Sequence, residues 1–337
     1  MNVRGILETG YPFIFMWGGR GTGKTYGILK HTIDSEKKFV LLRSRRTQVD
    51  MLRIPQFNPF KQINADTGLN IQPAPIGKEF SAFYHMKLDE NKDVKASDEI
   101  GYISALSTIG SLRGFGSADI ELLFYDEFIP EKSEQPVKNA GFALMNGYET
   151  INRNRELKGE KPLQMICASN SENIACPVFA ELGLIKRASE MNEKRQEICF
   201  LRDRGILLIN LCNSPISKQK ADTALYRMVG KGSDFYNMSI NNDFYSADYS
   251  SIEYRPLTEY TPLVSVGEIT IYEHKSKDEL YVTKKKSGTP IDLYSNTERH
   301  KTAFRRKYIW IWNMYLEDLV KFSDMESKIL LDFYFGK

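Results

Sequence analysis

Gly18-Gly19-Arg20-Gly21-Thr22-Gly23-Lys24-Thr25 is a complete G-x-x-x-x-G-K-[ST] pattern, and the interpretation of the whole chain starts from it. The apolar stretch 13–17 before it indicates a buried strand, and the stretch 26–32 after it is rich in helix formers. Strand, glycine loop and helix in this order bind nucleotide phosphates. We therefore expect all eight residues to bind the phosphates of ATP, with Lys24 on the β- and γ-phosphates and the Thr25 hydroxyl on Mg²⁺. A glycine-rich turn without a ligand is the alternative.

A second apolar run, residues 120–125, ends in Asp126 and Glu127. Such a run indicates a buried parallel strand that presents carboxylates at its C-terminal end. Asp126 is the expected Mg²⁺ ligand, and Glu127 is the expected general base for the attacking water. Acid pairs after apolar runs are common, but together with the loop at 18–25 this pair predicts an ATPase.

Polar residues near two other predicted strands are further candidates. Asn170 follows the apolar stretch 163–168, where it either senses the γ-phosphate or forms part of a turn. Arg113 lies in a glycine-rich loop just before the acidic strand. That position suits a residue that reaches phosphate and equally suits an ordinary surface arginine.

The stretch 137–157 predicts a helix. Its expected apolar face has side chains at 3.6-residue spacing: Phe142, Met145, Tyr148 and Ile151. Arg153 follows this face and is a candidate arginine finger for the site of a neighbouring subunit. The alternative is local, because Glu149 lies four residues earlier and would form an ordinary surface pair with Arg153.

Fold class follows from the alternation of predicted strands and helices over the first two thirds of the chain, which indicates α/β with a mainly parallel sheet. At 337 residues, two domains are expected. We assign residues 1–212 to a P-loop ATPase domain and the polar stretch 213–247 to a linker or lid. Residues 248–337 show an alternating pattern followed by helices, which predicts a small α+β domain with an antiparallel meander.

Positive charge is local in this chain, because the net charge is only +3. That value permits a nucleic-acid partner without requiring one. Two basic segments are candidate contacts for a DNA backbone, with solvated loops as the alternative. They supply Arg45, Arg46, Lys284 and Lys285.

Cysteine spacing and hydropathy exclude several other classes. The four cysteines, Cys167, Cys176, Cys199 and Cys212, form no C-x-x-C pair, so neither a zinc site nor a disulfide framework is indicated. No signal peptide is recognised, and no apolar run reaches the ~18 residues of a membrane helix. We expect a soluble, intracellular protein without a membrane partner.

The order and spacing of these motifs resemble the DNA-packaging ATPases of phi29-type tailed phages. The likeness covers roughly residues 13–245 and rests on the loop 18–25, the stretch 124–129 with Glu131-Lys132, Arg153-Asn154-Arg155-Glu156, Ser169-Asn170 and the spacing within 223–244. It implies a RecA-like ATPase domain of the additional-strand, catalytic-glutamate type. It also implies a C-terminal domain that is similar to an RNase H-like nuclease without its acids.

The resemblance also implies partners. Members of this family form a homo-oligomeric ring, expected to be a pentamer, on the portal of a procapsid in the infected bacterial cytoplasm. They drive double-stranded DNA inside with ATP and Mg²⁺, in some cases with an RNA adaptor. Arg153 falls where the family places its trans-acting arginine, and Arg113 matches a basic residue that acts across the interface. Arg45 and Arg46 fall in a stretch that faces the DNA channel, whereas Arg20 is a competing finger in cis.

Two other function classes remain open. One is a non-translocating, ATP-switched DNA-binding scaffold, against which Glu127 argues because a switch needs no catalytic base. The other is a P-loop metabolite kinase, which the separate basic C-terminal domain fits poorly. Nuclease activity is not expected, because Asp278, Asp292 and Glu298 lack the spacing of a two-metal site.

Overall fold

The computed structural model describes residues 3–76, 80–88, 94–112, 118–131, 134, 137, 139–170, 174, 176–213, 215–241 and 250–336. The chain forms two compact units. The first unit is Met1–Asn173 with Met191–Tyr245, and the second is Ile174–Glu190 with Ser246–Lys337. The segment 174–190, which we had placed in the ATPase domain, thus groups with the C-terminal part, and most of the lid segment groups with the first unit.

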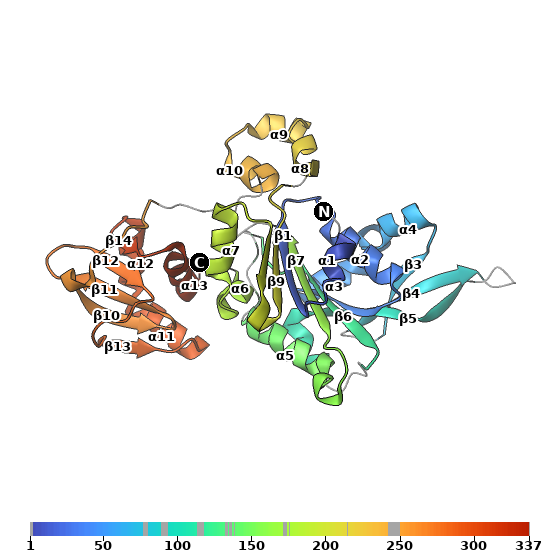
Figure 1. The fold of residues 1–337 in the computed structure, drawn as a ribbon, viewed down its shortest axis with the longest axis horizontal. Coiled ribbons are helices and arrows are strands. Elements are labelled where there is room, and N and C mark those ends of the chain that lie inside the picture. The colour runs from blue at the N-terminus through green and yellow to red at the C-terminus, as the bar shows by residue number, and fades with distance from the viewer. Residues whose placement is uncertain are drawn as a thin grey trace. The chain divides into compact units, whose positions relative to one another are not determined.

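A nine-stranded sheet forms the centre of the first unit in the described part of the chain, in the order β3-β4-β5-β2-β6-β7-β1-β9-β8 (Figure 1). Its six strands from β5 to β9 in this order are parallel, and β3, β4 and β8 run antiparallel to their neighbours. The fold class is therefore α/β with a mainly parallel sheet, as predicted. The strands are β1 (Phe13–Gly18), β2 (Lys38–Arg43), β3 (Ile71–Pro75), β4 (Ser81–Leu88), β5 (Val94–Ala105), β6 (Ile120–Asp126), β7 (Gln164–Asn170), β8 (Ile198–Leu201) and β9 (Ile206–Asn210).

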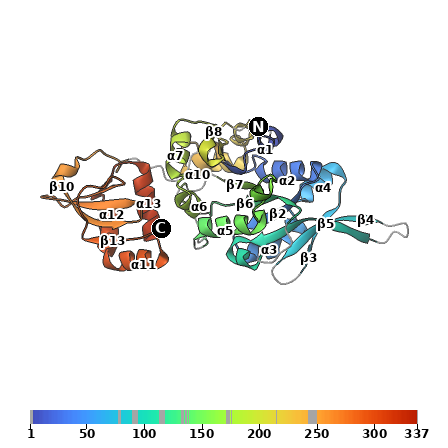
Figure 2. The same cartoon turned by 60° about the horizontal axis from the view of Figure 1, so that its bottom comes forward.

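Helices lie on both faces of this sheet (Figure 2). Ile28 and Leu29 of the helix after the loop share one buried cluster with Ile14 on β1. Phe13 points to the opposite face and packs on Tyr148 at 5.0 Å between ring centroids. The helices of the first unit are α1 (Val3–Leu7), α2 (Lys24–Asp34), α3 (Arg46–Leu52), α4 (Lys61–Thr67), α5 (Ala140–Asn152), α8 (Pro215–Lys220), α9 (Ala224–Val229) and α10 (Asp234–Tyr236), with 3-10 turns such as η2 (Leu106–Leu112) between them. Helix α7 (Ile185–Glu193) spans the boundary between the two units.

Helix α5 buries a different face from the one expected. Phe142 and Met145 are 60% and 42% exposed. Ile151 is buried as predicted, together with Ala140, Leu144 and Gly147. Gly147 lies so close to Ile109 of η2 that a Cβ at this position would overlap the isoleucine side chain. Close approach at a small residue therefore sets the rotation of α5, and the predicted face was wrong for Phe142 and Met145.

The second unit is a small α+β unit around a five-stranded sheet in the order β13-β10-β11-β12-β14. β10, β11 and β12 form the antiparallel meander expected from sequence, and β13 and β14 add parallel strands at its two edges. Helix α13 packs against the sheet and against α6. The elements are α6 (Pro177–Glu181), β10 (Tyr260–Val266), β11 (Ile269–His274), β12 (Leu280–Thr283), β13 (Asp292–Tyr294), α11 (Glu298–Lys307), α12 (Ile309–Leu316), β14 (Val320–Phe322) and α13 (Met325–Phe335).

None of the helices in the described ranges is long and apolar enough to cross a bilayer. The four cysteines are free thiols, and all except Cys199 are buried.

Candidate active site

The Lys24 side chain folds back onto the phosphate loop. The loop joins β1 to α2 at the carboxyl edge of the parallel strands, and the Lys24 Nζ donates to the carbonyls of Gly18 (3.0 Å) and Gly19 (2.9 Å). It also reaches Thr22 Oγ1 (3.2 Å) and Asn170 Oδ1 (3.3 Å). The ammonium thus stands where the loop would hold phosphate. Burial lowers the pKa of Lys24 to about 8.

The loop glycines are fixed by packing and by backbone conformation. A Cβ on Gly18 would overlap the Cβ of Leu211 and lie 3.2 Å from its Cγ. The backbone N–H of Leu211 donates to Trp17 O (2.8 Å), which holds the end of β9 against the loop. Gly21 and Gly23 have φ of 72° and 80°, in the left-handed region that glycine adopts without strain.

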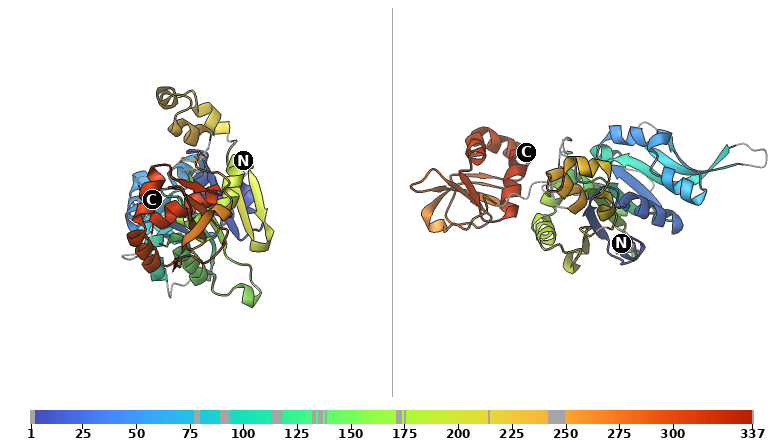
Figure 3. Two further views of the ribbon diagram at one scale, coloured as in Figure 1. Left: turned by 90° about the vertical axis from the view of Figure 1, so that its left-hand side faces the viewer. Right: turned by 90° about the horizontal axis from the view of Figure 1, so that it is seen from above.

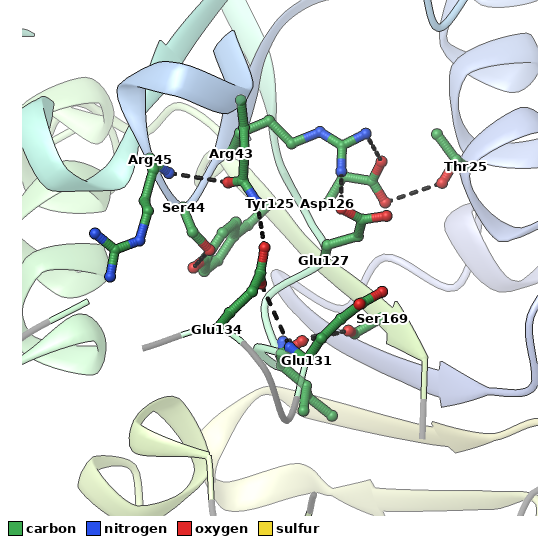
Figure 4. Close-up of polar contacts among 12 residues, drawn as sticks. Thr25, Arg43, Ser44, Arg45, Tyr125, Asp126, Glu127, Glu131, Glu134 and Ser169 are labelled. Atoms are coloured by element: carbon green, nitrogen blue, oxygen red, sulfur yellow. Dashed lines mark hydrogen bonds and ion pairs between the residues drawn. The ribbon is translucent and has the colours of Figure 1, made fainter. Parts of the chain in front are cut away.

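Asp126 and Thr25 form the part of the site that suits a divalent cation. The Thr25 hydroxyl donates to Asp126 Oδ1 at 2.9 Å (Figure 4). Burial raises the pKa of Asp126, while the Arg43 guanidinium and the Thr25 hydroxyl act in the opposite direction. A hydroxyl and a carboxylate beside a phosphate loop are the hard oxygen donors that Mg²⁺ takes together with substrate phosphates. The residues present therefore fit the expected ion.

Metal clusters of another kind are not seen. In the described residues, no three His, Cys, Asp or Glu side chains gather in a way that would hold a metal ion.

Glu127 follows β6 in a strained conformation. Its φ is 60°, in the left-handed region that is unfavourable for a residue with a side chain. Its backbone N–H donates to Ala168 O on β7 (2.7 Å), which holds this turn in place. The turn brings the half-exposed Glu127 carboxylate beside that of Asp126 (Figure 4). Strain of this kind persists where the surrounding structure enforces it, commonly at active sites.

Arg43 holds both carboxylates, which sequence reasoning did not foresee. Its Nη2 lies 3.0 Å from Asp126 Oδ2, and its Nη1 pairs with the Glu127 carboxylate (Figure 4). The guanidinium is mostly buried, and its Nε finds no acceptor among the described residues. Arg43 is the last residue of β2. Its role depends on β2 lying beside β6, where Leu42 pairs with Tyr125, and strand order was not predicted.

Arg20 is held away from the loop by a carboxylate. Its Nη2 lies 2.6 Å from Glu131 Oε1, and both side chains are about half exposed. The Glu131 backbone N–H in turn donates to Glu134 Oε2 at 3.4 Å (Figure 4). Arg20 thus belongs to the loop, but its guanidinium is directed towards the segment after β6.

Arg153 lies at the other edge of the sheet. It ends α5 with φ of 46°, and α5 runs from the carboxyl end of β6 back to the amino end of β7. The neighbouring Arg155 donates to Ala118 O (3.2 Å), which precedes β6. The structure therefore brings together Lys24, Thr25, Asp126, Glu127 and Asn170, and it separates Arg153 from them. Arg113 lies outside the described residues.

The candidate DNA-binding residues differ in their surroundings. Arg45 is exposed and is the N-cap residue that precedes α3, where its backbone N–H donates to Gln48 Oε1 (3.0 Å). Arg46 Nε lies 3.1 Å from Asp50 Oδ1. In the second unit, the Lys284 ammonium pairs with Glu268 (2.7 Å) and Glu326 (3.0 Å). Lys285 is exposed.

Comparison with known proteins places this geometry in a family. The family model for podovirus DNA encapsidation proteins (Gp16) matches residues 2–299. A DNA packaging protein of Bacillus phage B103 is 25% identical over 248 residues, which are 72% of this chain and 67% of that protein. The phi-28 gp11 DNA packaging motor superposes with a TM-score of 0.67 at 20% identity, over 100% of this chain and 98% of the other.

A second solved structure, the bacteriophage phi-29 viral genome packaging motor assembly, gives a TM-score of 0.63 at 16% identity, over 100% of this chain and 99% of the other. At these identities the two structures show a shared fold. The match of the family model extends over most of the chain and agrees with the resemblance drawn from the loop and the acid pair. The chain belongs to the podovirus DNA encapsidation protein (Gp16) family.

Proposed function

We propose that this protein is the ATP-hydrolysing subunit of a ring motor that drives double-stranded viral DNA into a preformed capsid. Membership of the DNA encapsidation family and the fold shared with two packaging motors support the packaging role. One observation carries the hydrolytic role: Glu127 stands beside Asp126 at the strand end next to the phosphate loop. A nucleotide-dependent switch has no need of a base at this position.

The loop residues act first. Lys24 exchanges the carbonyls of Gly18 and Gly19 for oxygens of the β- and γ-phosphates, because an anionic acceptor makes a stronger hydrogen bond than a neutral one. Thr25 and Asp126 would hold Mg²⁺, which when bound neutralises charge on the phosphate oxygens. Asn170 accepts a hydrogen bond from Lys24 in the structure, which supports our assignment of this side chain as the sensor of the terminal phosphate.

Glu127 takes the proton of the attacking water in this mechanism. In the structure the Glu127 carboxylate is occupied by the Arg43 guanidinium, so it is not free to accept a hydrogen bond from the water along that direction. Arg43 must therefore release Glu127 before the water is activated, while its second nitrogen stays on Asp126. In our proposal the residues for hydrolysis are therefore in place, but the Arg43–Glu127 ion pair keeps the base from acting.

Hydrolysis is tested by ATPase assays with and without double-stranded DNA. DNA should stimulate phosphate release, and Glu127→Gln should lower kcat by about 10²- to 10⁴-fold while nucleotide remains bound. Glu121→Gln is the matched control, because Glu121 is an exposed acid on the same strand. Equal turnover by wild type and Glu127→Gln would contradict the assignment. Nucleotide binding without DNA-stimulated release would favour the scaffold, and phosphate transfer to a small molecule would favour the kinase.

A neighbouring subunit supplies the arginine finger in our proposal, and Arg153 is the candidate. Its place at the sheet edge opposite the loop argues against a role in its own site. Mixing Arg153→Ala with Glu127→Gln chains should restore part of the ATPase, because mixed interfaces combine an intact base with an intact arginine. Lys158→Ala, an exposed change nearby, serves as the control. Absence of recovery at every mixing ratio would count against Arg153 and leave Arg20 or Arg113.

DNA contact and assembly complete the proposal. Arg45, Arg46 and Lys285 are our candidate contacts for the DNA backbone. Lys284 is a fourth candidate, but it must first break its ion pairs with Glu268 and Glu326. The family resemblance supports a five-membered ring docked on the procapsid portal in the host cytoplasm, with an RNA adaptor in some members. Each lost phosphate contact should lower the slope of log affinity against log salt by about 0.9.

We propose no nuclease activity for the second unit. The Asp292 carboxylate accepts hydrogen bonds from Lys307 and from Tyr308 (2.6 Å), and these lower the pKa of Asp292. Glu298 pairs with Lys301 at 2.6 Å. Asp292 and Glu298 are thus engaged in ion pairs with lysines and in a hydrogen bond with a tyrosine. These contacts support a structural role for the two carboxylates.

A further inference from the structure

Lys220 lies directly over the phosphate loop. Its Nζ donates to the main-chain carbonyl of Arg20, which is 200 residues away in sequence. A Cβ on Gly21 would overlap this ammonium and would lie 3.2 Å from the Lys220 Cε. Lys220 ends α8, in the lid segment, so this segment supplies a cation at the middle of the loop whose N–H groups are the expected phosphate ligands.

The two ends of the described part of the lid segment are joined to each other, and the first end lies near the loop. The segment follows Leu211 and Cys212, and the Leu211 N–H donates to Trp17 O beside the loop. The Arg195 Nη2 donates to Cys212 O (2.9 Å) and to Asn241 O (3.2 Å), so one guanidinium joins the residue before the segment to its last described residue. Between these ends, α8, α9 and α10 form a small body beside the sheet (Figures 1 and 3). Its own buried cluster is Tyr226, Tyr236 and Ile240.

Charge around the loop favours an anion between Lys24 and Lys220. The Lys24 ammonium donates to the carbonyls of Gly18 and Gly19, and the Lys220 ammonium donates to the next carbonyl of the same loop, that of Arg20. Arg20 has its own carboxylate in Glu131. A bound triphosphate would place negative charge between the two ammonium groups and replace neutral carbonyl acceptors with charged ones.

We propose that Lys220 is a phosphate ligand that the lid segment supplies to the nucleotide of its own subunit. The inference rests on the nucleotide site proposed above. When a nucleoside triphosphate binds, the Lys220 ammonium leaves the Arg20 carbonyl and donates to an oxygen of the terminal phosphate. Because α8 contacts the turn Asn237–Asn241, which contributes Ile240 to the buried cluster, this exchange draws the whole segment towards the nucleotide. After the terminal phosphate leaves, the ammonium returns to Arg20, so the position of the segment follows the state of the nucleotide.

Equilibrium binding to the full chain tests the proposal, with Mg²⁺ and two fluorescent probes, ADP and a non-hydrolysable ATP analogue. Lys220→Ala should weaken the triphosphate about tenfold, the contribution of one charge-assisted hydrogen bond, and the diphosphate by less than about threefold. Lys220→Arg should restore most of the loss. Lys231→Ala removes an exposed lysine from the same segment and should leave both affinities within about twofold.

Amide exchange gives a second readout. The triphosphate analogue should slow exchange in 215–229 of wild type and of Lys220→Arg, but not of Lys220→Ala. The proposal is overturned if Lys220→Ala matches Lys231→Ala, if it weakens both nucleotides equally, or if it tightens both, which would mean that Lys220 only blocks the loop. A wild-type chain that binds neither probe, or a Lys24→Ala chain that binds both normally, would instead refute the nucleotide site, and the role of Lys220 with it.

Discussion

The two units differ in how completely the described charged side chains find partners. At the edge of the large sheet, Arg43 is shared by Asp126 and Glu127, its Nε is unpartnered among the described residues, and Glu127 has φ of 60°. In the second unit, Lys284 is paired with two glutamates. Local conflicts of charge and backbone that nothing nearby resolves are expected where a ligand will resolve them. The contrast supports the loop edge as the proposed place of ATP hydrolysis, whereas the ion pairs of Lys284 are satisfied within the second unit.

Removing Arg43 should have the largest effect. Arg43→Ala leaves the buried Asp126 carboxylate without its cation and next to Glu127, so it should destabilise the first unit by about 3 kcal/mol. Lys284→Ala should cost less than about 1 kcal/mol, because its pairs are partly exposed. Amide exchange in β6 and β12 measures the two units separately. Equal losses in both units would remove the distinction between them.

The pH dependence of nucleotide binding should come next. The pKa of Lys24 is about 8 in the free chain, and phosphate must raise it, so binding takes up a proton above that pH. Affinity should be constant below about pH 8 and fall by up to about tenfold per pH unit above it. Arg20, Asp126, Glu127 and Lys220 also face this ammonium. Calorimetry on wild type and Lys24→Arg checks this, since an arginine does not titrate here and its profile should stay flat.

Asp332 tests whether the second unit is as settled as its ion pairs suggest. Burial raises the pKa of Asp332 to about 7, and its Oδ1 has no partner among the described residues. A raised carboxyl pKa means that the folded chain holds the extra proton, so stability should fall as pH rises from about 4 to about 7 and then level off. Asp332→Asn should stabilise this unit at pH 8 by about 1–2 kcal/mol and have little effect at pH 4. Urea unfolding followed by exchange in α13 would show no such gain if Asp332 is accommodated as an anion.

Relief of backbone strain should give the smallest effect. Glu127→Gly removes a side chain from a left-handed position and one of the two negative charges on Arg43, so it should stabilise the first unit by about 1 kcal/mol while abolishing ATPase activity. Glu36→Gly is a control, because Glu36 is an exposed residue at φ of 52° away from the acid pair. A stability gain at Glu36 but not at Glu127 would mean that the strand end is not strained.

Sequence reasoning succeeded where the signal was local. The strand, glycine loop and helix around Lys24 and the apolar run ending at Asp126 are continuous in sequence, and the parallel direction of the strands brings both to the carboxyl end of the sheet. It failed where the answer depended on residues distant in sequence. Arg43 acquires its role from the pairing of β2 with β6, and α5 is rotated by the contact of Gly147 with Ile109. Lys220 reaches the loop only because the chain after β9 returns to it.

Arg153 and the phosphate loop occupy opposite edges of one sheet, and this has a consequence for assembly. A two-fold dimer joins identical surfaces, so it cannot insert an arginine from each copy into the other's site when donor and acceptor lie on opposite sides. If Arg153 enters the nucleotide site of a neighbour, the copies must join head to tail. Each copy then inserts its Arg153 into the next copy and accepts the Arg153 of the previous copy at its own phosphate loop. Such a head-to-tail assembly closes into a ring only when a whole number of rotations between successive copies makes a full circle. Any other angle would produce an open helical filament.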